Sequence, residues 1–243
     1  MKSNAPQRIA TIDILRGVAI LMMFVFHFTF DLNFFGYVDI NFLTEPFWAN
    51  FRRFIVGSFL LLVGISIVLA NRKPLNIKRF NQRLLLLILY AVLVSLGSYL
   101  VFPESFIYFG ILHFIVVASI LGLAFRKFYW LNLILGIGIL VLELSYTNAY
   151  FDNPAINWIG FTTHLPYTED YVPLIPWFGI VLIGMFVGRA LFTRNTPEWL
   201  TWRANNIVTK TLAFGGRHSL HIYILHQPIF IGLIALVSGG FPN

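Results

Sequence analysis

Residues 16–32 read RGVAILMMFVFHFTFDL, and this stretch decides the class of protein. Most of its side chains are apolar enough for the hydrocarbon core of a membrane, but Arg16, His27 and Asp31 are ionisable. An ionisable group at the centre of a membrane helix costs roughly 2.5–3.5 kcal/mol or more, so such residues face the inside of a bundle and are rarely without a function. The stretch therefore predicts a membrane helix with one polar face.

The composition of the whole chain agrees with this prediction. Of the 243 residues, 58% are hydrophobic and only 11% are charged, whereas a soluble domain is about 25% charged. Several apolar runs reach the roughly 20 residues that span a bilayer. We therefore predict an all-α polytopic membrane helix bundle, with a single integral membrane domain over residues 1–243. The predicted helices lie near residues 14–35, 48–70, 84–102, 107–125, 128–146, 173–191 and 216–237.

The basic residues divide unevenly between the two sides of this predicted bundle. If the N-terminus is cytoplasmic, only Arg52 and Arg53 of the 17 lysines and arginines fall outside. Cytoplasmic loops of membrane proteins are rich in Lys and Arg. The pattern predicts an N-in, C-out orientation in the cell (inner) membrane. It also accounts for the net charge of +7 without nucleic acid. The chain has no cysteine, which excludes disulfides and a thiol nucleophile.

The ionisable residues of the first helix share one face. A helix turns about 100° and rises about 1.5 Å per residue, so Arg16 and His27 lie about three turns apart on the same side. Asp31 follows His27 at the i,i+4 spacing that lets side chains meet. A histidine oriented by a carboxylate is a standard general base, so we predict His27 and Asp31 as the catalytic pair. The spacing alone also fits a structural polar contact between helices.

Further candidates lie on other predicted helices. His113 in FGILHF and His226 in YILHQP lie within apolar segments, and Arg52 and Arg53 begin the second apolar segment on its outer side. We expect these four residues to line a polar cavity and to bind substrate. Each also fits a structural role, as a satisfied core histidine or as part of an ion pair.

A basic segment precedes the third predicted helix. Residues 71–83, NRKPLNIKRFNQR, contain five cations. Such a segment fits the phosphates of a nucleotide or the head groups of anionic lipids. The same residues also fit a role in membrane orientation alone.

Four segments of the chain carry a resemblance to a known family: residues 8–36 (RIATIDILRGVAILMMFVFHFTFDLNFFG), 109–123 (FGILHFIVVASILGL), 170–189 (DYVPLIPWFGIVLIGMFVGR) and 216–228 (GRHSLHIYILHQP). Together they resemble the bacterial members of the heparan-α-glucosaminide N-acetyltransferase catalytic-domain family. The spacing of Arg16 and His27 also resembles that of membrane acyltransferases of the acyltransferase-3 type. The segment GYVDINF, residues 36–42, has no histidine where the eukaryotic relative carries its catalytic one.

This resemblance implies an enzyme that moves an acyl group, usually acetyl, from cytosolic acyl-CoA to a hydroxyl or amine of an acceptor across the membrane. Arg16, Arg79 and Arg83 would then bind the phosphates of acetyl-CoA or another acyl-CoA co-substrate. His27 would act as the base or as the nucleophile. The expected partners are membrane lipids and a small-molecule or glycan acceptor, with no nucleic acid, metal or haem. The alternative is a non-enzymatic membrane protein, either a small-solute transporter or an accessory subunit. The sequence leaves a homo-oligomer open.

Overall fold

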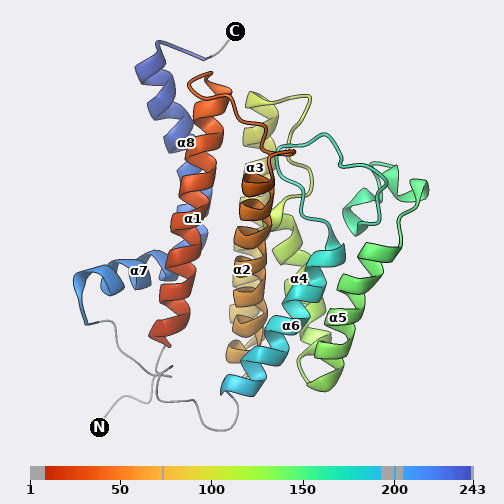
Figure 1. Ribbon diagram of the computed structural model, residues 1–243. Helices are drawn as coiled ribbons and strands as arrows, with labels where there is room; N and C mark the ends of the chain where they lie inside the picture. The colour runs from red at the N-terminus through yellow and green to blue at the C-terminus, as the bar shows by residue number, and fades with distance from the viewer. Residues whose placement is uncertain (1–8, 73, 193–199, 201–204, 242–243) are drawn as a thin grey trace. The chain divides into compact units, whose positions relative to one another are not determined.

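The computed structural model describes residues 9–72, 74–192, 200 and 205–241. These residues form eight α-helices and two short 3₁₀ helices and no β-strand, so the predicted all-α class is confirmed (Figure 1). The helices are α1 (Ala10–Phe34), α2 (Pro46–Ala70), α3 (Ile77–Val101), α4 (Ile111–Phe125), α5 (Trp130–Ser145), η1 (Ala149–Asp152), η2 (Asn157–Ile159), α6 (Leu174–Phe192), α7 (Ile207–Arg217) and α8 (Ser219–Ser238).

Among the described residues, five helices are long and apolar enough to cross a membrane: α1, α2, α3, α6 and α8. Helices α4 and α5 are also apolar but have only 15 and 16 residues. Each of the seven predicted segments therefore contains a helix. The count of seven spans and the N-in, C-out orientation stay predictions, because length and composition do not place a helix in a bilayer.

Several helix boundaries differ from the prediction by a few residues, and two of them have a local cause. Helix α3 begins at Ile77, well before residue 84, because the Asn76 side chain accepts a hydrogen bond from the Arg79 N–H at 3.0 Å and caps the helix. Lys78, Arg79 and Arg83, which were predicted to precede this helix, lie in its first turns. The last predicted helix, 216–237, begins too early, because the backbone leaves helical geometry at His218. The helix α7 before this break was not predicted.

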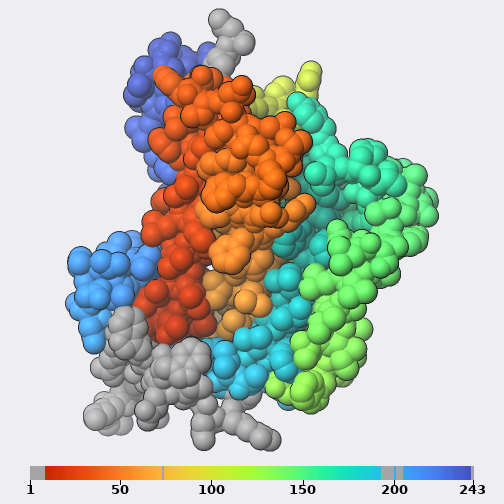
Figure 2. All heavy atoms as spheres, in the orientation of Figure 1, coloured from red at the N-terminus to blue at the C-terminus, as the bar shows by residue number. Residues whose placement is uncertain are grey.

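The contacts group the chain into two compact units. Unit 1 comprises Met1–Phe59 with Thr196–Asn243, and unit 2 comprises Leu60–Asn195. The prediction of one membrane domain stays a prediction. In unit 1, α1 and α8 lie side by side and run toward the same end, while α7 lies against the first half of α1 (Figures 1 and 2). The core of this unit is a cluster of buried apolar side chains: Ile20, Met23, Phe26, Phe42 and Ile55.

The backbones of α1 and α7 touch at two glycines. A Cβ atom on Gly17 would lie 2.7 Å from the carbonyl carbon of Leu212, and one on Gly216 would lie 2.6 Å from the carbonyl carbon of Asp13. Carbon atoms pack at about 3.5–4.0 Å, so any other residue at these two positions forces the helices apart. The two glycines therefore determine how closely α7 approaches the start of α1.

Glycines also bring helices together in unit 2. A Cβ on Gly64 of α2 would lie 2.8 Å from the backbone nitrogen of Met185 in α6, and one on Gly188 would lie 2.9 Å from the Cα of Ile65. Small residues at such positions let membrane helices approach closely. Gly64 and Gly188 therefore allow α2 and α6 to pack closely.

The segment between α5 and α6 is tied to the connection between α3 and α4 by hydrogen bonds. The Asp170 carboxylate accepts from the Ile111 N–H at 2.9 Å and caps α4. The Tyr171 hydroxyl donates to the Asn157 carbonyl at 2.6 Å, and the Asn157 amide donates to the Tyr108 hydroxyl at 2.7 Å. Burial raises the pKa of Tyr171 to about 12, so this hydroxyl keeps its proton and continues to donate.

Candidate active site

Two of the predicted histidines meet between α1 and α8 in unit 1. The ring centroids of His27 and His226 lie 5.0 Å apart, with an angle of 67° between the ring planes. His226 is buried and His27 is half-buried. The structure thus brings together two ionisable residues from opposite ends of the sequence. Helix periodicity alone did not determine this contact.

The hydrogen bond of His226 determines which of its ring nitrogens carries the proton. Its Nδ1 lies 2.6 Å from the carbonyl oxygen of Tyr223. A carbonyl can only accept, so Nδ1 carries the hydrogen and Nε2 carries a lone pair in the neutral ring. Among the described residues this buried Nε2 has no hydrogen-bond partner. It is therefore able to accept a proton or a hydrogen bond.

Asp31 lies one turn beyond His27 and is 1% exposed. In the described part of the chain its hydrogen bond goes to Gln227 of α8, whose amide nitrogen donates to Asp31 Oδ1 at 2.6 Å, and not to His27 as the spacing suggested. An ionised carboxylate can only accept, so the amide nitrogen must face it and the amide oxygen must face away. Sequence reasoning missed Gln227, although it directly follows His226 in LHQP.

His27, Asp31, His226 and Gln227 form what we call the polar cluster. Within the described residues, five buried side-chain atoms have no hydrogen-bond partner, and three of them belong to this cluster: Asp31 Oδ2, His226 Nε2 and Gln227 Oε1. All three are hydrogen-bond acceptors in the arrangement derived above. Leaving such groups unpaired costs about 1–3 kcal/mol each. The cluster is therefore arranged to receive several N–H or O–H donors.

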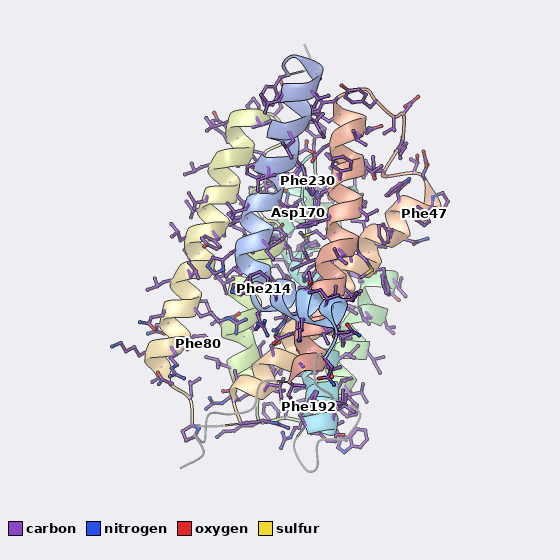
Figure 3. The ribbon with its side chains drawn as sticks, turned by 90° about the vertical axis from the view of Figure 1, so that its left-hand side faces the viewer. Phe47, Phe80, Asp170, Phe192, Phe214 and Phe230 are labelled. Carbon is purple, nitrogen blue, oxygen red and sulfur yellow. The ribbon has the colours of Figure 1, made fainter. Side chains whose placement is uncertain are left out.

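Aromatic side chains surround the two histidines. Phe24 stacks on His226 with ring centroids 5.8 Å apart, and Phe26 meets His27 edge-on at 5.5 Å. Phe230 contacts both Phe24 and His226, and Figure 3 shows it where α8 lies beside α1. Apolar walls lower the local dielectric constant, which strengthens the electrostatic and hydrogen-bonding interactions of the cluster.

The two arginines in the first turns of α2 that were predicted to bind substrate differ in burial and in contacts. Arg52 is half-buried and interacts electrostatically with His27. Arg53 is exposed and donates to the Asn50 side chain at 3.2 Å. Arg52 is thus the member of the pair that adds positive charge beside the polar cluster.

His113 belongs to unit 2, where both of its ring nitrogens serve the fold. Its Nδ1 accepts from the Gly110 N–H at 3.3 Å, so its Nε2 carries the hydrogen and donates to Ser95 Oγ at 3.1 Å. Ser95 in turn donates to the Ile107 carbonyl at 2.6 Å. This geometry favours a structural role for His113. Its predicted role in binding substrate stays a prediction.

The three arginines predicted to bind phosphate lie in different units. Arg16, in unit 1, donates to the buried carboxylate of Asp13 at 3.2 Å. Arg79 and Arg83 are exposed on the first turns of α3 in unit 2. The predicted approach of Arg16 to Arg79 and Arg83 stays a prediction. Among the described residues no group of three His, Cys, Asp or Glu side chains is placed to hold a metal ion.

These features define an integral membrane helix bundle with a buried cluster of polar side chains between two of its candidate spans. The family model described as the catalytic region of heparan-alpha-glucosaminide N-acetyltransferase matches residues 8–228, and the chain belongs to this family. The matched region contains all four residues of the polar cluster. Family membership indicates a membrane acetyltransferase. Comparison with curated proteins and with solved structures gives no match.

Proposed function

We propose that the protein moves an acetyl group from acetyl-CoA to a hydroxyl or amine of an extracytoplasmic acceptor, such as a sugar. Family membership supports acetyl transfer. The observation that carries the proposal for this chain is the polar cluster, because its three unpaired acceptor atoms lie beside an imidazole in an apolar helix interface.

The cluster suits an acceptor with a hydroxyl or amino group. Such a molecule brings O–H or N–H donors for Asp31 Oδ2, Gln227 Oε1 and His226 Nε2. A molecule without these donors leaves the buried atoms unpaired, and a site built for hydrogen bonds rejects such analogues strongly. The same atoms place the reacting group of the acceptor next to His27.

In this proposal His27 takes the proton of the acceptor O–H or N–H as its oxygen or nitrogen attacks the thioester carbonyl carbon. The carbon–sulfur bond then breaks, and the thiolate of CoA leaves and receives a proton. His226 Nε2 accepts a hydrogen bond from the acceptor molecule and holds it beside the imidazole of His27. Arg52 stabilises the negative charge that develops on the carbonyl oxygen.

The experiment uses the full chain purified in a neutral detergent, with radiolabelled acetyl-CoA and a panel of amino and neutral sugars. His27→Ala should lower transfer at least about a hundredfold, the usual loss of a general base. His226→Asn should also lower it, because asparagine keeps a donor for the Tyr223 carbonyl but loses Nε2. His221→Ala is the matched control, since His221 is an exposed histidine on α8, the helix that carries His226.

Full activity of His27→Ala contradicts the proposal. Failure of the wild type to bind or use acetyl-CoA favours a transporter or an accessory subunit instead.

A second measurement separates the two roles of His27. If His27 is the nucleophile, labelled acetyl-CoA without acceptor should leave an acetyl group on the protein, and His27→Ala should remove it. If His27 is the base, no label should remain on the protein although transfer to the acceptor is rapid.

A further inference from the structure

Helix α7 runs across α1, whereas α8 runs along it (Figure 1). All three helices belong to unit 1, and α1 and α8 are candidate membrane spans. A helix that runs across the spans lies close to the plane of the membrane that they cross. With 11 residues, α7 is also too short for a span, which takes about 20. It therefore has the orientation of a helix that lies at the membrane surface.

Contacts at both ends make α7 a fixed element of the fold. The Asn206 side chain accepts from the Thr209 N–H at 2.9 Å and caps the first turn. At the other end, His218 Nδ1 donates to the Phe214 carbonyl at 2.9 Å, and the centres of the two rings lie 4.3 Å apart. The chain turns into α8 directly after this corner. Helix α7 thus presents its outer side in one defined orientation.

The centre of this outer side is apolar. Gly216 meets the backbone of α1, and Ile207, nine residues earlier, lies on the opposite side of α7, because a helix turns about 100° per residue. Phe214 lies two turns after Ile207 on the same side. Ile207 is 77% exposed, Phe214 is 56% exposed, and Val208 beside them is 63% exposed. These three side chains, the apolar row of α7, are not buried by the part of the fold that the structure describes.

Two cations lie along one edge of the apolar row. Lys210 follows Ile207 by three residues and Arg217 follows Phe214 by three residues, so both are displaced toward the same side by about 60°. Both are exposed. Helix α7 contains no acidic residue, and neither cation forms an ion pair with another described residue. An apolar stripe with Lys and Arg on the polar side is typical of helices that lie in the membrane interface.

This arrangement favours a lipid surface over a protein partner. A lipid layer accepts apolar side chains among its acyl chains and cations at its phosphates, and an in-plane helix reaches both levels at once. A protein partner would have to supply an apolar groove and carboxylates in matching register. In the predicted N-in orientation α7 lies on the cytoplasmic side, where the leaflet is anionic and attracts Lys and Arg. The charge of α7 therefore complements this leaflet.

We propose that α7 is an in-plane membrane helix that docks on anionic phospholipids. Ile207 and Phe214 enter the acyl-chain boundary, and Lys210 and Arg217 bind the lipid phosphates. The close packing of α7 on α1 then has a function, because it fixes the level of α7 relative to the spans. Docking requires neither acetyl-CoA nor an acceptor, so this proposal and the proposed acetyl transfer fail independently.

The test places a fluorescent label on α7 in the full chain. The chain has no cysteine, so Thr211→Cys gives a single labelling position, and Thr211 is exposed beside the apolar row. The labelled protein is reconstituted in nanodiscs that contain equal parts of phosphatidylcholine and phosphatidylglycerol. One of the two lipids at a time is brominated in the upper part of its acyl chains. Bromine quenches the label at short range, so quenching reports which lipid lies against α7.

We expect both brominated lipids to quench the label, and brominated phosphatidylglycerol to quench it more. Lys210→Gln/Arg217→Gln should lower the preference for phosphatidylglycerol about tenfold or more, because each cation near an anionic surface contributes several-fold. The matched control is Lys78→Gln/Lys127→Gln, which removes the same charge from exposed positions outside α7 and should leave the preference unchanged.

A charge-conserving variant separates loss of docking from loss of folding. Lys210→Arg/Arg217→Lys exchanges the two cations and should keep the preference for phosphatidylglycerol. The proposal is wrong if neither brominated lipid quenches the label, because the outer side of α7 then faces water or protein. It is also wrong if the two lipids quench the wild type equally, or if the control outside α7 loses the preference as much as Lys210→Gln/Arg217→Gln does.

Discussion

Replacing Gly216 by alanine should destabilise the protein, whereas the same change at the neighbouring Gly215 should not. Both glycines lie in α7, but only Gly216 is buried against α1. A Cβ on Gly216 would lie 2.6 Å from the Asp13 carbonyl carbon and 3.1 Å from the Arg16 Cβ, whereas a Cβ on Gly215 meets nothing within 4 Å. The two substitutions add the same methyl group to the same helix, one into a contact and one into open space.

The size of the effect follows from these distances. Carbon atoms pack at about 3.5–4.0 Å, so α7 must move about 1 Å away from α1 to accommodate the new methyl group. The obstructing atoms belong to the backbone and cannot rotate away as a flexible side chain does. Overpacking of this kind costs about 1–3 kcal/mol. Both variants share the gain in helix propensity of about 1 kcal/mol for alanine over glycine. The difference between them is therefore about 1–3 kcal/mol.

Thermal unfolding in one detergent at one heating rate measures this difference. A change of 1 kcal/mol shifts the midpoint by about 2–4 °C in chains of 150–250 residues. Gly215→Ala should match or exceed the wild-type midpoint, and Gly216→Ala should fall below both. Gly17→Ala should act like Gly216→Ala, because it presses on Leu212 from the other helix. Equal midpoints for Gly215→Ala and Gly216→Ala would refute the close packing of α7 on α1.

Three further predictions concern the polar cluster, the segment before α6 and the orientation of the chain. Asp31→Asn should lower acetyl transfer less than Asp31→Leu in the labelled assay, because asparagine keeps an oxygen that accepts from Gln227 and leucine does not. The pKa of Tyr171 is raised to about 12 from 10.0, so its contribution to stability is present below pH 10 and is lost as the pH rises through about 12. Tyr171→Phe should remove one tyrosine that titrates near pH 12 in absorbance at 295 nm, and an unchanged titration curve contradicts this assignment. A tag after residue 243 should be cleaved by external protease while a tag before residue 1 is protected, and the reverse result contradicts the N-in, C-out orientation.

The helices could be predicted from sequence because their signal is local. A run of about 20 apolar residues indicates a membrane helix whatever it packs against, and all seven predicted segments contain a helix. His27, Asp31 and His226 could be found individually for a related reason. An ionisable side chain in an apolar run is costly, so its presence marks a polar interior without any knowledge of its neighbours. Gln227 carries no charge, and the sequence contains no comparable signal for it.

The partners of these residues depended on tertiary structure alone. Periodicity places His27 and Asp31 on one face of α1, but it does not say which helix that face meets. The packing of α1 against α8 decided that His27 contacts His226 and that Asp31 bonds to Gln227 and not to its neighbour one turn away. The same holds in unit 2, where Arg72, Arg126 and Arg189 line one cavity although they come from three separate segments of the chain. Helical geometry is set by contacts a few residues apart, whereas hydrogen bonds and charge clusters between helices depend on how distant segments pack.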